Sequence, residues 1–176
     1  MADLDLAKTQ VALVTNYGTM LVSFRPDKAP KTVHNFVKLA KDGFYDGTKF
    51  HRVVEGFMIQ GGCPKTKNAN PMDDGSGGPG YQLQDEFSDL THRRGVLSMA
   101  NLGRPNTGGS QFFVMHANRP DLDRRYAVFG KLVEGLDTLD RIAKVPVQAQ
   151  PLNRREISRP SVDVQLLRAV LLPTLK

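Results

Sequence analysis

Hydrophobic residues in this chain gather in short runs, and the segments between the runs are rich in glycine, proline and asparagine. The runs lie at residues 11–14, 20–24, 50–60, 96–100, 111–115, 127–132 and 162–170. Their length and spacing are typical of strands, and the first two flank Asn16, Tyr17 and Gly18 as the arms of a hairpin. Strands that follow one another in this way favour an antiparallel sheet or barrel over alternating strand and helix units.

Two segments have the spacing of amphipathic helices. The first begins at Pro30, ends near Gly43, and places apolar residues at i, i+3, i+4 and i+7. These residues are Val33, Phe36, Val37 and Ala40. The second covers residues 136–143, and its predicted inner face consists of Leu136, Leu139 and Ile142. The chain shows no internal repeat and no linker that would divide it, so we predict a single domain over residues 1–176.

Composition narrows the class of protein. A chain of 176 residues suits one domain and buries roughly two-thirds of its unfolded surface, enough for a core without disulfides. Cys63 is the only cysteine, which fits a reducing compartment and excludes a zinc site built on cysteines. The acidic N-terminus lacks the basic start and apolar run of a signal peptide, and no apolar stretch approaches the ~20 residues that cross a bilayer. We therefore expect a cytoplasmic protein with no membrane partner.

The net charge of +6 raises the question of a nucleic-acid partner. Arginine pairs occur at residues 93–94, 124–125 and 154–155, in separate segments that read as turns. No RNA-binding aromatic motif or zinc-finger spacing accompanies them. Dispersed charge of this kind favours solvated loops, so we expect no specific nucleic-acid partner and only weak, salt-sensitive binding.

Several motifs resemble cofactor or metal sites but lack required parts. Residues 75–80 match the dinucleotide fingerprint G-x-G-x-x-G, yet Pro79 interrupts them and no acidic residue lies ~20 positions later. Turn geometry near a pocket explains these glycines better. Asp121 and Asp123 begin like a calcium loop, but the required glycine and terminal glutamate are missing. The four histidines have no metal-ligand spacing, so we predict no metal and no cofactor.

A single arginine stands among apolar residues in the segment 50–62. A glycine divides this segment into two strands, which puts Arg52 on one strand and Phe57, Met58 and Gln60 on the other. Side chains at i and i+2 share a face of a strand, so the arrangement holds a guanidinium beside an apolar surface.

Ordinary structural roles remain open for these residues on spacing alone. An arginine on a sheet is usually a surface charge that lies along apolar neighbours. Phe57, Met58 and Phe113 could equally belong to a hydrophobic core. The amide residues at positions 60, 101 and 111 could equally be residues of turns or of strand ladders. His51 points to the strand face opposite Arg52, which favours a structural role for it.

A second segment, residues 98–113, adds amides, turn residues and a pair of phenylalanines. Together with residues 50–62, 77–81 and 128–131, it closely resembles the signature segments of the cyclophilin family of peptidyl-prolyl cis-trans isomerases. The resemblance implies a mainly β fold, a closed eight-stranded antiparallel β-barrel capped by two α-helices. It also implies that Arg52 is catalytic. The substrate-binding residues that it implies are Phe57, Met58, Gln60, Ala100, Asn101, Gln111, Phe113, Leu122 and Tyr126.

Two positions depart from the best-known members of the family. Asp121 stands where many cyclophilins have a tryptophan, and the chain has no tryptophan anywhere. Tyr126 stands where many have a histidine at the edge of the pocket. The resemblance names cyclosporin as a ligand, and because an ionised aspartate resists desolvation we expect the affinity for cyclosporin to be weakened.

Rotation about an X-Pro bond breaks no covalent bond, so it needs no nucleophile, metal or acid-base pair. A charged guanidinium suits the reaction, because the prolyl nitrogen regains a lone pair when the amide twists. We therefore predict a monomeric, cofactor-free isomerase that acts on proline-containing peptides and on unfolded or folding proteins. The alternative is a proline-peptide binding module with little catalytic activity. The presence of both Arg52 and Gln60 argues against that alternative, since binding alone needs no cation at the nitrogen.

Overall fold

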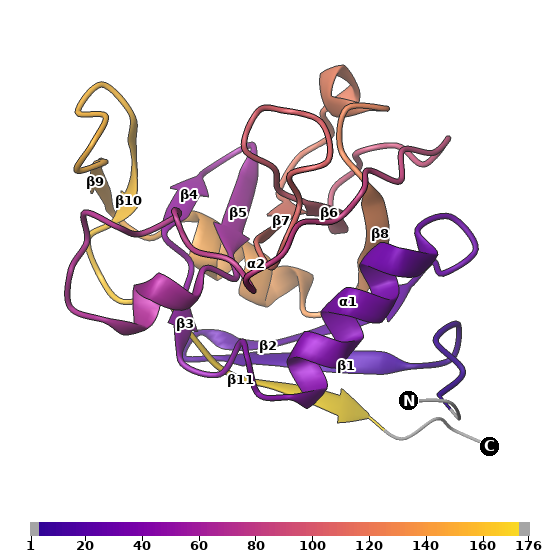
Figure 1. Cartoon of the computed structure of the whole chain (residues 1–176). Helices are drawn as coiled ribbons and strands as arrows, with labels where there is room; N and C mark the ends of the chain where they lie inside the picture. The colour runs from indigo at the N-terminus through magenta and orange to yellow at the C-terminus, as the bar shows by residue number, and fades with distance from the viewer. Residues whose placement is uncertain (1–3, 173–176) are drawn as a thin grey trace.

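The computed structural model describes residues 4–172, and the centre of the fold is one curled β-sheet (Figure 1). The strand order across this nine-stranded sheet is β3-β11-β1-β2-β8-β6-β7-β5-β4, and every neighbouring pair is antiparallel. The strands of the sheet are β1 (Gln10–Thr15), β2 (Gly18–Phe24), β3 (Thr48–Lys49), β4 (Arg52–Val54), β5 (Met58–Gly61), β6 (Val96–Met99), β7 (Phe112–Met115), β8 (Val128–Glu134) and β11 (Gln165–Leu172). A separate hairpin pairs β9 (Val147–Ala149) with β10 (Ile157–Pro160).

The sheet is nearly closed by the chain itself. Its two edge strands, β3 and β4, are consecutive in the sequence and are joined only by Phe50 and His51. Phe50 turns its ring into the interior, where it meets Phe112 edge-on at a centroid distance of 6.1 Å. The predicted antiparallel, mainly β fold with two helices is confirmed. The prediction of a closed eight-stranded barrel is wrong in detail. In the described residues the sheet has nine strands, and its edge strands β3 and β4 share no ladder, because Phe50 and His51 carry the chain from one edge to the other.

The two predicted helices lie against different strands of the curled sheet (Figure 1). Helix α1 (Pro30–Lys41) packs against β8 and β11, and all four residues of its predicted stripe are buried. Gly43 follows with φ +71°, a left-handed conformation that suits glycine and ends the helix. Neither α-helix in residues 4–172 has the length and apolar character needed to span a bilayer.

Helix α2 (Leu136–Ala143) has the predicted bounds but a slightly different inner face. Leu139 and Ile142 are buried as expected, together with Thr138 and Ala143, whereas Leu136 is 44% exposed. At 3.6 residues per turn, Leu136 falls about 90° from the centre of that buried face. The spacing therefore gave the right face but placed its boundary one residue too far.

Apolar side chains form two clusters on opposite faces of the sheet. The larger cluster fills the inside of the curl, and the aromatic rings of Phe36, Tyr45, Phe112 and Phe129 meet there. The smaller cluster is centred on Met58, Phe113 and Met115. Strand β7 contributes to both clusters in alternation, as side chains of a strand must. The consequence is a second apolar surface on the outer face of the sheet, beside β4 and β5.

Candidate active site

Three functional side chains line up across neighbouring strands on the outer face. Arg52 on β4 is opposite Gln60 on β5, and Gln60 is opposite Phe113 on β7. Directly opposed residues of antiparallel strands project to the same face with Cβ atoms about 5 Å apart. Strand register alone therefore places a guanidinium, an amide and a phenyl ring in one row. The i and i+2 spacing of Met58 and Gln60 adds the thioether to that face.

This row borders a pocket of about 150 Å³. Strands β4, β5 and β7 supply its floor, where Met58 and Phe113 are 1% and 5% exposed. Segments after β6 and around the short 3-10 helix η2 (Pro120–Leu122) supply the rim. The lining residues are Arg52, Phe57, Met58, Gln60, Ala100, Asn101, Phe113, Leu122 and Tyr126. The structure thus brings nine of the ten sequence-predicted site residues to one pocket.

Gln111 is the tenth, and it lies beside the Arg52 pocket rather than in its lining. Its side-chain amide donates hydrogen bonds to the carbonyl oxygens of Gly75 and Gly77, at 2.7 and 2.9 Å. Its Oε1 accepts a hydrogen bond of 3.1 Å from Nε2 of Gln60. Gln111 therefore connects the glycine-rich loop to Gln60, and its hydrogen bond holds the side-chain amide of Gln60 at the pocket.

The loop over residues 75–82 forms turns and lines a neighbouring cavity of about 440 Å³ that shares Gln60, Ala100 and Asn101 with the first pocket. Gly75 and Gly80 have φ values of +81° and +90°, which explains two of the glycines. Residues 81–95 form no helix, so the loop lacks the helix that a dinucleotide fingerprint requires directly after its glycines.

Arg52 is held by a partner that sequence reasoning missed. Its Nε donates to the Oε1 of Glu156, whose side chain comes from the loop of the β9–β10 hairpin. Nη1 of Arg52 approaches the sulfur of Met58 at 3.9 Å, and the guanidinium carbon lies 5.9 Å from the ring centroid of Phe57. The Arg52 guanidinium lowers the pKa of Glu156 below its usual value, so this carboxylate stays charged. Glu156 stands in a polar loop with no periodic pattern, and nothing in the sequence links it to a residue 104 positions away.

His92 supports the pocket from behind. Its Nδ1 lies 2.9 Å from Oδ1 of Asp123 and its Nε2 lies 3.0 Å from Oγ of Ser98, while its ring stacks on Phe113 at 15°. This Ser, His and Asp order has the hydrogen-bond pattern of a hydrolase triad. However, Ser98 and His92 are 0% and 1% exposed, so no substrate reaches the hydroxyl. The network instead fixes the Phe113 ring that forms the pocket floor.

Asp121 does not line the pocket but is paired at its edge. Its carboxylate accepts two hydrogen bonds from Arg119, at 2.8 and 2.7 Å, and the Arg119 guanidinium lowers the pKa of this carboxyl. The guanidinium carbon of Arg119 lies 4.2 Å from the ring centroid of Phe57. The guanidinium of the Arg119–Asp121 ion pair therefore packs against Phe57, a residue of the pocket. The resemblance led us to compare position 121 with the tryptophan of many relatives, and here it is part of an ion pair.

His51 lies away from the pocket, in the interior of the protein. His51 is buried, and this burial lowers its pKa to about 4, so the ring is neutral at pH 7. It lies outside the lining of the Arg52 pocket, in agreement with the predicted face. Within residues 4–172, no group of three or more His, Cys, Asp or Glu side chains is arranged to hold a metal ion.

His116 and Asp140 brace the turn that carries Phe57. Nδ1 of His116 accepts a 2.8 Å hydrogen bond from the backbone N–H of Gly56, and its backbone N–H donates to the carbonyl of Phe57 at 2.8 Å. Its Nε2 lies 2.9 Å from Asp140, which also accepts two hydrogen bonds from Arg94, at 2.7 and 2.9 Å. The hydrogen bonds from Arg94 lower the pKa of Asp140 to about 2.

Asp140 should therefore contribute to acid stability. Its pKa in the folded state is below the ordinary value of about 3.8, so its contribution is complete above pH 4 and is lost as the pH falls toward 2. Because the side chain is 38% exposed, solvent screening limits the contribution to about 1 kcal/mol. We expect Asp140→Asn to be less stable than the wild type at pH 7 in urea unfolding, with a difference that shrinks between pH 4 and 2. A difference that stays constant over this range would contradict the assignment.

The fold and the site together describe a class of protein in which a curled antiparallel β-sheet carries a small apolar pocket on its outer face, with an arginine beside the pocket. Comparison with known proteins identifies the family. The sequence model of the cyclophilin type peptidyl-prolyl cis-trans isomerase/CLD family matches residues 10–167, and this chain belongs to that family.

Relatives in very different organisms agree with this membership. A peptidyl-prolyl cis-trans isomerase of Synechococcus elongatus is 48% identical over 147 residues, which cover 79% of this chain and 96% of that protein. A peptidyl-prolyl cis-trans isomerase-like 3 protein of Gallus gallus is 44% identical over 151 residues, 81% of this chain and 89% of that protein. A crystal structure of a Cryptosporidium parvum cyclophilin type isomerase, described as in the presence of the dipeptide Ala-Pro, has a TM-score of 0.82 at 34% identity, and the match covers 93% of this chain and 99% of that one.

Proposed function

We propose that this isomerase acts on X-Pro bonds of proline-containing peptides and of unfolded or folding proteins, with Arg52 as its catalytic residue. The observation that carries the proposal is the row of Arg52, Gln60 and Phe113 along an apolar pocket. The Cryptosporidium relative studied in the presence of Ala-Pro supports a proline ligand at the same fold.

The chemistry required is stabilisation of a twisted amide. The planar X-Pro bond is protected by a barrier of ~18–20 kcal/mol, and spontaneous rotation takes tens to hundreds of seconds. An acceleration of roughly 10⁴- to 10⁵-fold corresponds to about 5.5–7 kcal/mol. When the bond twists, the prolyl nitrogen regains a lone pair that accepts a hydrogen bond from a cation. The Nε of Arg52 is engaged by Glu156, so the terminal nitrogens are the donors left for substrate.

One hydrogen bond to a charged group contributes only about 1.5–3 kcal/mol net, so Arg52 supplies part of the effect. Selective binding of the twisted form supplies the rest. Phe57, Met58, Phe113 and Leu122 line the pocket, and in this proposal they form the apolar cup that takes the proline ring. Gln60 keeps one amide hydrogen after its bond to Gln111, and this hydrogen is available to hold a substrate carbonyl.

A protease-coupled isomerisation assay on a short X-Pro peptide tests the proposal. We expect catalysed cis-to-trans conversion that is proportional to enzyme concentration and is unchanged by a chelator, since the proposed mechanism uses no metal. A proline-peptide binding module would instead bind the peptide without speeding its conversion. Activity lost to chelation and restored by a divalent ion would contradict the proposed chemistry.

A further inference from the structure

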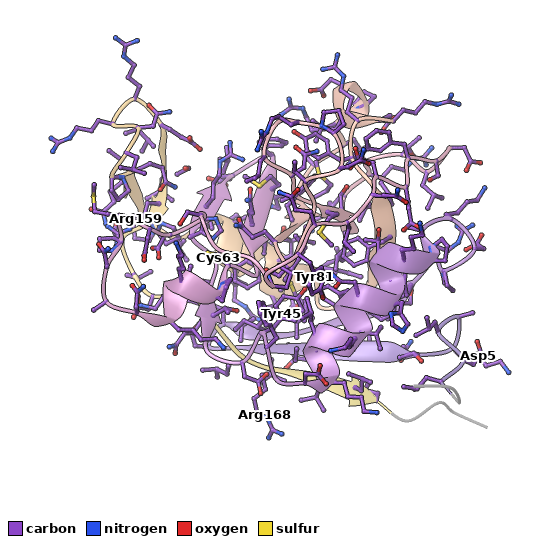
Figure 2. The ribbon with its side chains drawn as sticks, in the orientation of Figure 1. Asp5, Tyr45, Cys63, Tyr81, Arg159 and Arg168 are labelled. Carbon is purple, nitrogen blue, oxygen red and sulfur yellow. The ribbon has the colours of Figure 1, made fainter. Side chains whose placement is uncertain are left out.

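The β9–β10 hairpin is attached to the edge of the sheet beside Arg52. It forms a two-stranded sheet of its own, and β10 lies against β4 (Figure 1). Gln150 fixes its base, because Nε2 donates to the carbonyl of His51 at 3.1 Å and to Oγ of the buried Ser158 at 2.9 Å. The hairpin lies at one side of the barrel, and Figure 2 labels Arg159 on its strand β10. A polar segment is thus held in a defined place next to the pocket.

Glu156 is the residue of this hairpin that reaches the site. It precedes β10 directly, and its backbone carbonyl accepts a 2.8 Å hydrogen bond from Gln150. Its Oε1 accepts hydrogen bonds from Oγ of Ser158 at 2.9 Å and from Nε of Arg52. Both side chains of the ion pair are about one-third exposed, at 34% for Arg52 and 31% for Glu156. The carboxylate is therefore oriented by its own hairpin and partly shielded from water.

We infer that Glu156 is a positioning residue, which holds the Arg52 guanidinium with its terminal nitrogens toward the proline pocket. The guanidinium is planar, so fixing Nε in a charged hydrogen bond also fixes the plane of its other donors. An unrestrained arginine samples many rotamers, and immobilising such a side chain at the transition state is unfavourable by an amount equivalent to about three- to tenfold in rate. This inference rests on the proposed catalytic role of Arg52.

The same carboxylate also offsets part of the positive charge of Arg52, an effect of opposite sign. Glu156 binds the Nε edge of the guanidinium, whereas the prolyl nitrogen would meet the terminal nitrogens. The negative charge of Glu156 therefore acts on the prolyl nitrogen from a longer distance, and its electrostatic effect there is weaker. The orientation of the guanidinium, in contrast, acts directly on the donors that meet the substrate. We therefore expect orientation to dominate. If charge dominated, removing Glu156 would make the enzyme faster.

Steady-state kinetics on an X-Pro peptide test the role, with Glu156→Ala, Glu156→Gln, Glu156→Asp and wild type compared. We expect Glu156→Ala to lower kcat three- to tenfold while KM changes less than twofold, and Glu156→Gln, which keeps an acceptor for Nε, to lose less. Glu156→Asp should recover part of the loss. Arg155→Ala is the matched control, because this exposed neighbour offers no side-chain hydrogen bond or ion pair to the described residues, and it should behave as wild type. Wild-type or raised kcat in both Glu156→Ala and Glu156→Gln would overturn the inference.

A second measurement separates positioning from a general effect on the fold. The Nε–H signal of Arg52 in NMR spectra should be protected from exchange with water in the wild type and should lose this protection in Glu156→Ala. Urea unfolding of the same variant checks the hairpin, and Glu156→Gln, which is nearly isosteric, keeps the test valid if the alanine variant is destabilised. An Nε–H signal that is equally protected in Glu156→Gln, Glu156→Ala and wild type would also overturn the inference.

A double-mutant cycle distinguishes failure of this inference from failure of the proposed function. If Glu156 acts only through Arg52, Glu156→Ala should have no further effect on kcat in an Arg52→Ala background. A further loss in that background would show that Glu156 acts by another route. Wild-type activity in Arg52→Ala alone would remove the proposed role of Arg52, and the inference with it. A slow Arg52→Ala beside an unaffected Glu156→Ala would overturn the inference and leave the proposed function standing.

Discussion

Replacing Arg52 with alanine should lower kcat/KM for an X-Pro peptide at least tenfold, which corresponds to ~1.4 kcal/mol of transition-state stabilisation. The guanidinium is the one cation that lines the pocket in the described residues, and a charge-assisted hydrogen bond contributes about 1.5–3 kcal/mol. Stability should change little, because the side chain is 34% exposed and the Glu156 carboxylate left behind is 31% exposed and reaches water. Protease-coupled kinetics and urea unfolding of the purified variant measure the two effects separately.

Arg52→Lys is the matched control for charge without the planar fork. A lysine ammonium keeps the positive charge but cannot bind Glu156 and the substrate through separate edges of one rigid group. We therefore expect Arg52→Lys to recover only part of the activity that Arg52→Ala loses. An alanine variant that turns over peptide as fast as the wild type would exclude Arg52 from the mechanism, and a lysine variant of full activity would show that charge alone is sufficient.

The parts of the fold that were predicted correctly are those with a local hydrophobic period. The stripe of α1 and the bounds of α2 follow from spacing within one turn of helix. The β9–β10 hairpin has no such period: its strands span only Val147–Ala149 and Ile157–Pro160, and their burial does not alternate clearly. What holds this hairpin in place is side-chain hydrogen bonding from Gln150, which leaves no trace in a hydropathy pattern.

The candidate site likewise contains residues that the local sequence pattern could predict and residues that it could not. Phe112 and Phe113 look alike in the sequence, and the alternation of a strand sends the first into the barrel and the second to the pocket. The spacing predicts that the two side chains face opposite sides of the strand, but it does not show which side binds substrate. The family resemblance indicated that Phe113 lies on the substrate side. Two residues were missed. Glu156 accepts a hydrogen bond from Arg52. His92, which is held by hydrogen bonds at both of its ring nitrogens, stacks on Phe113. Such contacts depend on the tertiary fold, so only coordinates reveal them.

Cyclosporin should inhibit this isomerase weakly while peptide turnover stays normal. Asp121 stands where the resemblance leads one to expect an indole in many relatives, and it is held as an anion by two hydrogen bonds from Arg119. An indole offers a large apolar face and an N–H donor, whereas an ionised carboxylate offers acceptors only and resists desolvation. Losing one neutral hydrogen bond and part of an aromatic contact should weaken affinity by ~1–3 kcal/mol, or roughly ten- to a hundredfold.

Asp121→Trp should recover part of this affinity and Asp121→Asn should separate the two causes. The asparagine variant removes the charge and the bidentate pair with Arg119 but adds no aromatic surface, so we expect it to gain much less affinity than the tryptophan variant. Turnover of small peptides should be similar in all three proteins, because Asp121 does not line the pocket and its neighbour Leu122 does. Inhibition constants measured in the isomerisation assay decide the matter. Low-nanomolar inhibition of the wild type would show that position 121 does not control the contact, and equal gains in the two variants would assign the effect to charge rather than to the indole.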